Sequence, residues 1–282
     1  MSRRKSGFTL IELSIVLVII GLIVGGVLVG RDLISSAAGR AQLTQIEKFK
    51  TAVHTFYGKF GYLPGDIPDP NASQFGLVAR GTGPAQGDGN GFISGSNGSI
   101  RSNVFNVSGE SALFWVDLST IKLIEGTFNT STATSAPTLS GGTAIAPYLP
   151  AAALGGDGFV TMNANYDYTA DYFTVATITA VTLGRATTYS GIMTVAQAYA
   201  MDSKIDDGLP GSGSLLTAMP QLTGIPGSWR WANLANGVTI PTTATAPSST
   251  TCYDNGNAAG VTPTYSLSQT GSSKNCFMSF RM

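Results

Sequence analysis

The chain has 282 residues, of which 43% are hydrophobic and only 11% are charged, and its formal net charge is zero. This composition suffices for a globular core of ordinary size, and it offers no basic field of the kind that nucleic-acid binding requires. Nucleic acid is therefore not expected as a partner. The charge is unevenly placed, because residues 1–60 hold 8 Lys/Arg against 3 Asp/Glu and residues 61–282 hold 8 against 13. We expect a basic stem followed by an acidic head.

Residues 8–30 form an apolar run in which Glu12 is the only charged side chain. At about 1.5 Å per residue this run makes a helix of roughly 35 Å, which is enough to cross a bilayer core. Arg3, Arg4 and Lys5 stand in front of the run, and basic residues hold the adjacent end of a membrane helix in the cytoplasm. The rest of the chain is then expected outside the cytoplasm.

Beyond Asp32 the apolar pattern continues without a proline but becomes one-sided. Spacings of three and four residues predict an amphipathic helix, with an apolar stripe made of Ile34, Ala38, Ala41, Phe49, Val53, Phe56 and Phe60. One helix should therefore run from about residue 8 to about residue 57, on the order of 75 Å long. Glycine and proline between residues 58 and 70 end it.

The remaining 61–282 segment predicts a globular head of the α+β class with an antiparallel sheet. Helices are expected at 110–123 and 192–204, and strands at 159–162 and 172–183. Residues 130–142 are rich in Ser, Thr, Ala and Gly and predict a loop. The predicted organisation is a leader peptide at 1–7, a transmembrane half of the N-terminal helix at 8–30, an amphipathic half at 31–60 and the head at 61–282.

Only two cysteines occur, Cys252 and Cys276, both in polar surroundings near the C-terminus. If the head is exported, one disulfide between them is the expected pairing, and two free thiols are the alternative. Closing a loop of this length would contribute roughly 3 kcal/mol to stability by the chain-entropy estimate.

The most specific signal is the run KSGFTLIEL, residues 5–13. It resembles the N-terminal motif of the type IV filament superfamily, which comprises type IV pilins and the pseudopilins of type II secretion. In that family a membrane aspartyl peptidase, the prepilin peptidase, cuts after the glycine and methylates the new N-terminal phenylalanine. The resemblance implies a cut between Gly7 and Phe8 and N-methylation of Phe8. It is close over about the first 30 residues and extends to the head only in general plan.

The same resemblance implies a location and a set of partners. The chain would be a single-pass protein of the inner membrane, with its N-terminus in the cytoplasm and its head in the periplasm. It would meet identical or related pilin subunits and the filament assembly platform, and the filament would be periplasmic or at the cell surface. Many type IV pilins have a C-terminal disulfide-bounded loop at the filament surface, and Cys252 and Cys276 are similar to it. The alternative is a stabilising disulfide with no role in recognition, and the two roles are compatible.

Glu12 is the residue with the clearest expected role. A carboxylate inside an apolar span costs about 2.5–3.5 kcal/mol, so it should have a partner. In the family this partner is the N-terminal amine of a neighbouring subunit, which here would belong to Phe8. Such pairing would stagger neighbouring helices and set their register. Family pilins often carry a proline within the hydrophobic half of this helix, and none occurs here. Local looseness would come instead from Gly21, Gly25, Gly26 and Gly30, or these glycines would be small packing contacts between helices.

Three other interpretations of the N-terminal run stay open. It could be a secretory signal peptide cut near residues 35–39, although a carboxylate is unusual in such a core. It could be an uncleaved anchor. It could also tether an extracytoplasmic binding module, such as an adhesin, that never polymerises.

The sequence offers little that predicts catalysis. His54 is the only histidine and lies on the stem, which excludes a Ser-His-Asp or histidine-rich metal site in the head. No nucleotide-binding or nucleophile-elbow motif occurs, although a carboxylate-pair glycosidase stays conceivable. We expect no enzyme, no catalytic residue and no cofactor.

Three clusters of Asp and Asn could hold calcium or could simply form turns. They are Asp88 with Asn90, Asp202 with Asp206 and Asp207, and Asp254 with Asn255 and Asn257. None fits an EF-hand loop, so turns are the favoured interpretation and no metal residue is predicted.

Overall fold

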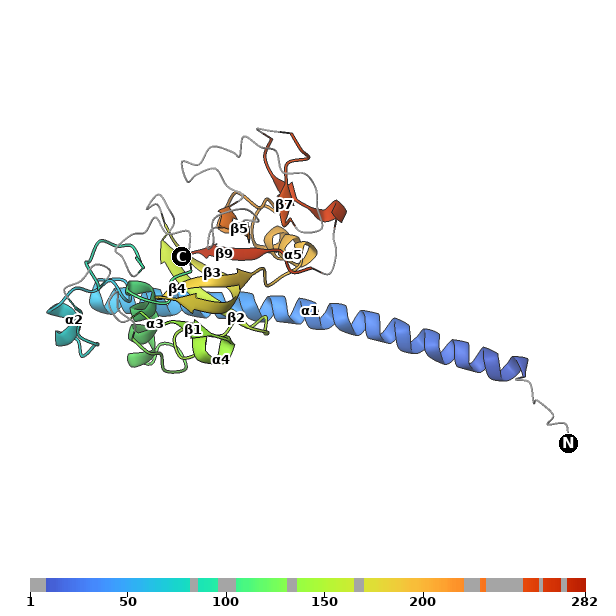
Figure 1. Cartoon of the computed structure of the whole chain (residues 1–282), viewed down its shortest axis with the longest axis horizontal. Helices are drawn as coiled ribbons and strands as arrows, with labels where there is room; N and C mark the ends of the chain where they lie inside the picture. The colour runs from blue at the N-terminus through green and yellow to red at the C-terminus, as the bar shows by residue number, and fades with distance from the viewer. Residues whose placement is uncertain are drawn as a thin grey trace.

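The structure is a computed structural model that describes residues 9–81, 86–95, 105–130, 136–164, 170–220, 229–231, 251–258, 261–269 and 273–282. One long helix carries an α+β head on its C-terminal half, while its N-terminal half projects away from the head (Figure 1).

Helix α1 (Leu10–Phe60) is continuous over 51 residues, from the apolar run into the stem. It ends at Gly61, whose φ of 75° is left-handed and whose N–H donates to the carbonyl of Tyr57 at 2.8 Å. Glycine adopts this conformation without steric cost, so it is a common helix end. The sequence placed the end slightly early, because Gly58 stays within the helix.

The stem buries a stripe that differs in part from the predicted one. Phe49, Val53 and Phe56 are buried as expected, but Ile34 is 71% exposed and Ala41 is exposed. The buried stripe instead starts at Gln42 and Ile46. The prediction failed at Ile34 because the head buries α1 only from Gln42, about two turns further along, and no described residue covers the Ile34 side chain.

Seven strands form one antiparallel sheet in the order β1-β3-β9-β5-β6, with β2 and β4 also paired to β3. Their bounds are β1 (Leu139–Ser140), β2 (Gly158–Ala164), β3 (Asp171–Thr182), β4 (Arg185–Ser190), β5 (Leu215–Pro220), β6 (Trp229–Trp231) and β9 (Phe277–Arg281). A separate two-stranded sheet pairs β7 (Tyr253–Asp254) with β8 (Thr264–Tyr265).

Strand β3 is the centre of the sheet. Its first half pairs with β2 and with β9 over the same residues, so these two strands lie on opposite edges of β3. Its second half pairs with β1 and β4, which occupy opposite edges for the same reason. Phe173 and Val175, near the middle of the paired region, are fully buried. The C-terminal strand β9 thus lies inside the sheet, between β3 and β5.

The shorter helices complete the head. They are α2 (Asn71–Gln74), α3 (Glu110–Thr120), α4 (Gly142–Ile145), α5 (Val195–Ile205) and the 3-10 turn η1 (Leu267–Gln269). Helix α3 contacts α1 and β2, and α5 contacts α1 and β5. Residues 110–119 of α3 are buried on all sides, whereas the sequence suggested a single apolar face.

Aromatic rings join the stem to the head. Phe49 of α1 lies 5.1 Å from Trp115 of α3 and 5.9 Å from Phe173 of β3, measured between ring centroids. These rings bury large apolar areas, and the Phe49–Trp115 pair packs edge to face, which adds to the burial energy. The core of the head is therefore built on the second half of α1.

The sequence located most regular elements of the head. The predicted strands at 159–162 and 172–183 correspond to β2 and β3, and the predicted helices correspond to α3 and α5. The expected loop at 130–142 was partly wrong, because Leu139 and Ser140 pair with β3 as β1. Residues 131–135 of that loop lie outside the described residues.

Candidate functional site

The first half of α1 is an apolar surface on which none of the described residues of the head packs. Its best 18-residue window has a mean hydropathy of 2.9 and none of it is buried, so α1 is long and apolar enough to cross a membrane by length and composition. Large side chains point outward all around it; Leu10 is 87% exposed and Leu22 is 72% exposed. Each such side chain gains about 1.5–3 kcal/mol when it leaves water. This segment therefore needs lipid or other helices around it.

A capping box closes the N-terminal end of the helix. The hydroxyl of Thr9 accepts from the backbone N–H of Glu12 at 3.3 Å. In return, Oε2 of Glu12 accepts from the N–H and the hydroxyl of Thr9, both at 2.8 Å. This reciprocal pair satisfies donors that a helix start leaves free. The sequence analysis singled out Glu12 for its charge and missed its local role as a cap.

Glu12 nevertheless keeps capacity for a further partner. Both hydrogen bonds from Thr9 go to Oε2, and among the described residues no donor is found for Oε1. The carboxylate is exposed at the side of the apolar surface. A cation from a neighbouring molecule could therefore reach it. The pairing of Glu12 with a neighbour's Phe8 amine stays a prediction, and Gly7 and Phe8 themselves lie outside the described residues.

The glycines of the apolar half face open space. A Cβ built on Gly21, Gly25, Gly26 or Gly30 would meet no atom of the described part of the chain within 4 Å. Gly21 with Gly25, and Gly26 with Gly30, have the four-residue spacing that lets membrane helices approach closely. These positions would suit contact with neighbouring helices.

Two glutamines fix the stem to the head, and the sequence analysis did not find them. The side-chain amide of Gln45 donates to the carbonyl of Ala151 at 2.8 Å, and its Oε1 accepts from Ala153 N–H at 3.0 Å. Gln42 is fully buried and accepts from Leu154 N–H at 3.2 Å. Both hydrogen-bond the loop that precedes β2. No local pattern marks these two glutamines in the sequence, because their partners lie more than one hundred residues away.

Buried carboxylates hold the loop of residues 86–94 against the head. Asp66 accepts from Gly89 N–H and Gly91 N–H, each at 2.8 Å. Glu110 accepts from Gly87 N–H at 3.1 Å and from Ser94 N–H at 2.7 Å. Glycine is required at residue 87, because its φ is 92° and a Cβ there would lie 2.3 Å from a backbone oxygen.

These carboxyl groups are protonated more easily than usual because they are buried. Burial raises the pKa of Glu110 to about 7 and that of Asp66 to about 6. Asp171 accepts from Ile93 N–H at 3.0 Å, and burial raises its pKa to about 7. Removal from water disfavours the charged form, and the hydrogen bonds offset only part of that cost. These groups make the head's stability depend on pH.

In the three Asp and Asn clusters, aspartate carboxylates accept hydrogen bonds from backbone N–H groups within turns. Asp88 accepts from Asn90 N–H at 3.0 Å, Asp207 from Leu209 N–H at 2.8 Å and Asp254 from Gly256 N–H at 2.9 Å, all with the two-residue step of an Asx turn. Carboxylate oxygens of Asp66, Asp88 and Glu110 lie within 4.8 Å of one another, as do those of Asp202, Asp206 and Asp207. Since backbone donors already engage most of these groups, the geometry favours turns.

The two cysteines are joined. Cys252 and Cys276 form a disulfide with a Cα–Cα distance of 5.1 Å, and both residues are fully buried. Cys276 also accepts from Ile192 N–H at 3.0 Å and donates its N–H to Met193 at 3.1 Å. The bond ties the start of the β7–β8 hairpin to the residue before β9. Its sulfurs belong to the core of the head, while the enclosed loop includes exposed residues.

Comparison with known proteins matches one part of the chain. Residues 2–28 match the prokaryotic N-terminal methylation motif, which is the prepilin-type signature of type IV pilins and pseudopilins. No curated protein and no solved structure matches the chain. The motif points to a prepilin-like structural subunit, anchored in a membrane and processed by a prepilin peptidase, rather than to an enzyme.

Proposed function

We propose that the chain is a structural subunit of a type IV pilus or a type II secretion pseudopilus, made as a prepilin. The leader is cut between Gly7 and Phe8, and Phe8 is N-methylated. Before assembly the subunit resides in the inner membrane, where residues 8–30 span the bilayer and the head lies in the periplasm. It then joins identical or related subunits on an assembly platform.

One observation carries this proposal: a match to the methylation motif lies at the start of an uninterrupted helix whose first half is exposed and whose second half is docked in a head. An exposed apolar half can exchange lipid contacts for helix contacts without disturbing the head. Polymerisation in the membrane needs that separation.

The alternative is a membrane-anchored binding module that does not polymerise. A surface pocket lined by α1 and by residues 123–125, 150, 151 and 153 of the head is compatible with it. Intact mass of the protein purified from membranes separates the two. A methylated chain that starts at Phe8 supports the filament subunit, and an intact leader supports the anchored module.

The cut site yields a direct prediction. Gly7→Val places a branched side chain at the scissile bond, where glycine gives unhindered access to the backbone. We expect the full-length precursor to accumulate in the membrane, with filament yield falling below detection. Ser6→Ala serves as the matched control in the leader. Normal processing of the Gly7→Val protein, measured by intact mass, would remove the case for this site.

A further inference from the structure

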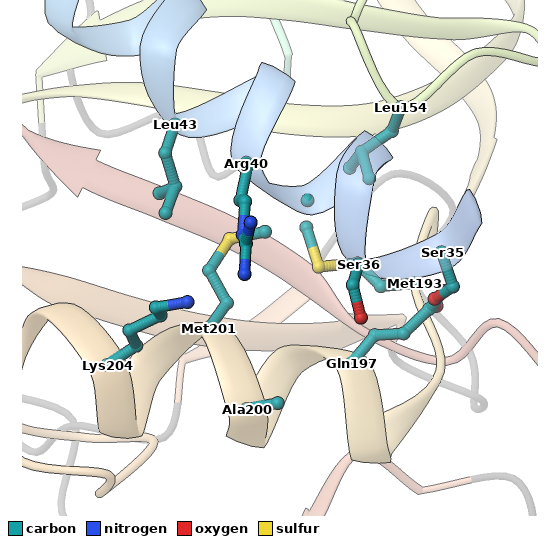
Figure 2. A pocket seen from close by; sticks show the side chains of 11 residues that line it. Ser35, Ser36, Arg40, Leu43, Leu154, Met193, Gln197, Ala200, Met201 and Lys204 are labelled. Carbon is teal, nitrogen blue, oxygen red and sulfur yellow. The ribbon is translucent and has the colours of Figure 1, made fainter. Parts of the chain in front are cut away.

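Helix α5 presents two faces to different parts of the chain. Figure 2 shows Gln197 and Met201 directed from α5 toward the stem, where the Gln197 amide donates to the hydroxyl of Ser35 at 2.6 Å. The other face carries Asp202, which is fully buried and whose Oδ2 accepts from the hydroxyl of Tyr265 in β8 at 2.7 Å. An aspartate therefore lies where α5 meets the interior of the head.

Turn hydrogen bonds account for the neighbouring Asp206 and Asp207 but not for Asp202. The Oδ1 atom of Asp202 is buried and, among the described residues, accepts no hydrogen bond. The N–H of Gly208 lies close enough to lower the pKa of this carboxyl group, but it makes no hydrogen bond to Oδ1. A buried acceptor without a donor is costly, and more so when it carries charge. Such an oxygen is normally satisfied by a bound water or ion.

Two further carboxylates lie beside Asp202. Asp202, Asp206 and Asp207 each offer one oxygen, and the three oxygens lie within 4.8 Å of one another. Asp206 is held in place by the N–H of Leu215 at 2.8 Å, and Asp207 by the N–H of Leu209 at 2.8 Å. Oxygens on opposite sides of a calcium ion are roughly 5 Å apart, since each lies about 2.3–2.6 Å from it. The three carboxylates are therefore close enough to contact one ion.

No basic side chain neutralises these three aspartates. In the part of the chain that the structure describes, no Lys or Arg nitrogen forms an ion pair with any of them. Asp117 provides a comparison, because it also has a buried oxygen without a donor. Its other oxygen, however, lies 2.6 Å from the guanidinium of Arg80. Asp202 is thus a buried carboxylate with two acidic neighbours and no positive charge.

The other group of converging carboxylates in the head differs in this respect. Asp66 and Glu110 each accept a backbone N–H on both of their oxygens. Asp88, the third member, is exposed to water. The buried oxygens of that group are therefore already satisfied by the protein. Among the described residues, the need for an outside cation is specific to the group around Asp202.

We infer that Asp202, Asp206 and Asp207 bind one divalent cation, and that Ca²⁺ is the ion that fits them. Carboxylate oxygens suit a hard cation, and Ca²⁺ accepts irregular coordination by six to eight oxygens, whereas Mg²⁺ requires a nearly ideal octahedron. Asp207 is exposed, so water supplies further ligands on that side. The ion links α5 to the loop before β5 and, through Tyr265, to the β7–β8 hairpin. This site goes beyond the proposed function and does not depend on it.

The test uses the full-length chain in neutral detergent, stripped of metal with EDTA, and Tb³⁺ as the probe. Tb³⁺ occupies calcium sites and emits light when a nearby tyrosine is excited, and the Tyr265 hydroxyl lies 2.7 Å from Asp202 Oδ2. We expect saturable emission that Ca²⁺ displaces with a Kd of about 0.1–1 mM, the range of extracellular calcium modules. Mg²⁺ should displace it about tenfold less well.

Asp202→Asn separates the ion from the fold. Asparagine keeps an acceptor for Tyr265 and places an amide donor beside Asp206 and Asp207. The variant should bind Ca²⁺ at least about tenfold more weakly, and it should lose the rise of a few degrees in melting temperature that Ca²⁺ gives the parent. Without Ca²⁺ it should melt no lower than the parent. Asp88→Asn, in the other carboxylate group, is the matched control and should retain the full response.

Asp207→Asn is a second variant at an exposed position, so it tests the site even if Asp202→Asn does not fold. It should also weaken Ca²⁺ binding, while its side-chain oxygen still accepts from Leu209.

Two results would overturn the inference. An unchanged Ca²⁺ response in the Asp202→Asn or Asp207→Asn protein would place the ion elsewhere. No displacement of Tb³⁺ by Ca²⁺ up to about 10 mM, ten times the weakest expected Kd, would leave a proton or a water as the partner of Asp202. The assay requires neither cleavage nor polymerisation, so an intact leader in the processing experiment would reject the filament proposal without changing this result.

Discussion

At the residue scale, Glu12 has two roles that can be separated. It caps the helix through Thr9, and it presents a charge in an apolar surface. Glutamine can perform the cap but cannot form the ion pair, because capping boxes accept Glu or Gln at this position. Glu12→Gln therefore tests the ion pair alone, whereas an apolar residue at this position would remove the cap and the ion pair together.

We therefore expect Glu12→Gln to be inserted and processed but to assemble poorly. Removing one partner of an ion pair in a low-dielectric setting costs about 3–5 kcal/mol, enough to lower filament yield by far more than tenfold. Thr9→Ala is the control, because it weakens the cap and leaves the charge. Filaments sheared from cells are quantified by immunoblot. Parental yield for Glu12→Gln would refute the ion-pair role and favour the anchored module.

Asp171 is the second residue with a distinct expectation, because its pKa is raised to about 7 by burial. The folded chain holds this proton to a higher pH than the unfolded chain, where an aspartate has a pKa near 3.9. Stability from this group is therefore fully present below about pH 4 and is lost as pH rises toward about 7.

Asp171→Asn mimics the protonated acid and keeps an oxygen for the N–H of Ile93. The melting temperature of the parent should fall by a few degrees between pH 4 and pH 7, and this slope should be shallower in the variant. The exposed Asp157→Asn serves as control. Thermal melts at four pH values suffice, and an identical slope for Asp171→Asn and the parent would contradict the assignment.

At the scale of elements, α1 is one helix with two different environments. Phe49 packs against Trp115 and Phe173 in the head, whereas Ile34 is 71% exposed. Both residues belong to the apolar stripe predicted from the sequence, but within the described residues only Phe49 is covered by the head. Shortening each of the two side chains to alanine should therefore change the stability of the head by different amounts.

Phe49→Ala should lower the free energy of unfolding by about 3–5 kcal/mol, since it opens a cavity between the stem and the head. Ile34→Ala should change it by less than about 0.5 kcal/mol. Denaturant unfolding of the full chain in detergent, followed by tryptophan fluorescence, measures both. Comparable losses in the two variants would mean that the head covers the stem further toward the membrane.

The elements found from the sequence share one property, which is that their signals are local. The pattern of apolar residues along a short stretch of the chain predicts β2, β3 and α5, and also the apolar half of α1. The docking of Gln42 and Gln45 and the burial of Asp171 depend on segments far away in the chain, so no local pattern could reveal them. The methylation motif, in contrast, is a contiguous stretch.

At the scale of the whole molecule, the disulfide connects the β7–β8 hairpin to the sheet. Both cysteines are buried, so a reductant should reach the bond slowly while the head is folded. Protein recovered from the cell envelope should contain the Cys252–Cys276 bond, detected as a linked peptide pair by mass spectrometry without reduction.

The double variant Cys252→Ser with Cys276→Ser should have a lower melting temperature. Loss of the disulfide should reduce the free energy of unfolding by about 2–5 kcal/mol. Two alkylatable thiols in the envelope protein would be the contrary result. They would also speak against an oxidising location for the head.

The position of β9 has a consequence for how the head is made. Its residues, Phe277–Arg281, complete the sheet between β3 and β5, and the N–H of Met282 donates to Asp171 at 3.0 Å. Because the head follows the membrane helix along the chain, its sheet cannot be completed during export until β9 has crossed the membrane. Contacts of such long sequence separation form slowly. The strands β3 and β5 should therefore stay without their shared neighbour for most of translocation, and the sheet should be completed late, after β9 has crossed.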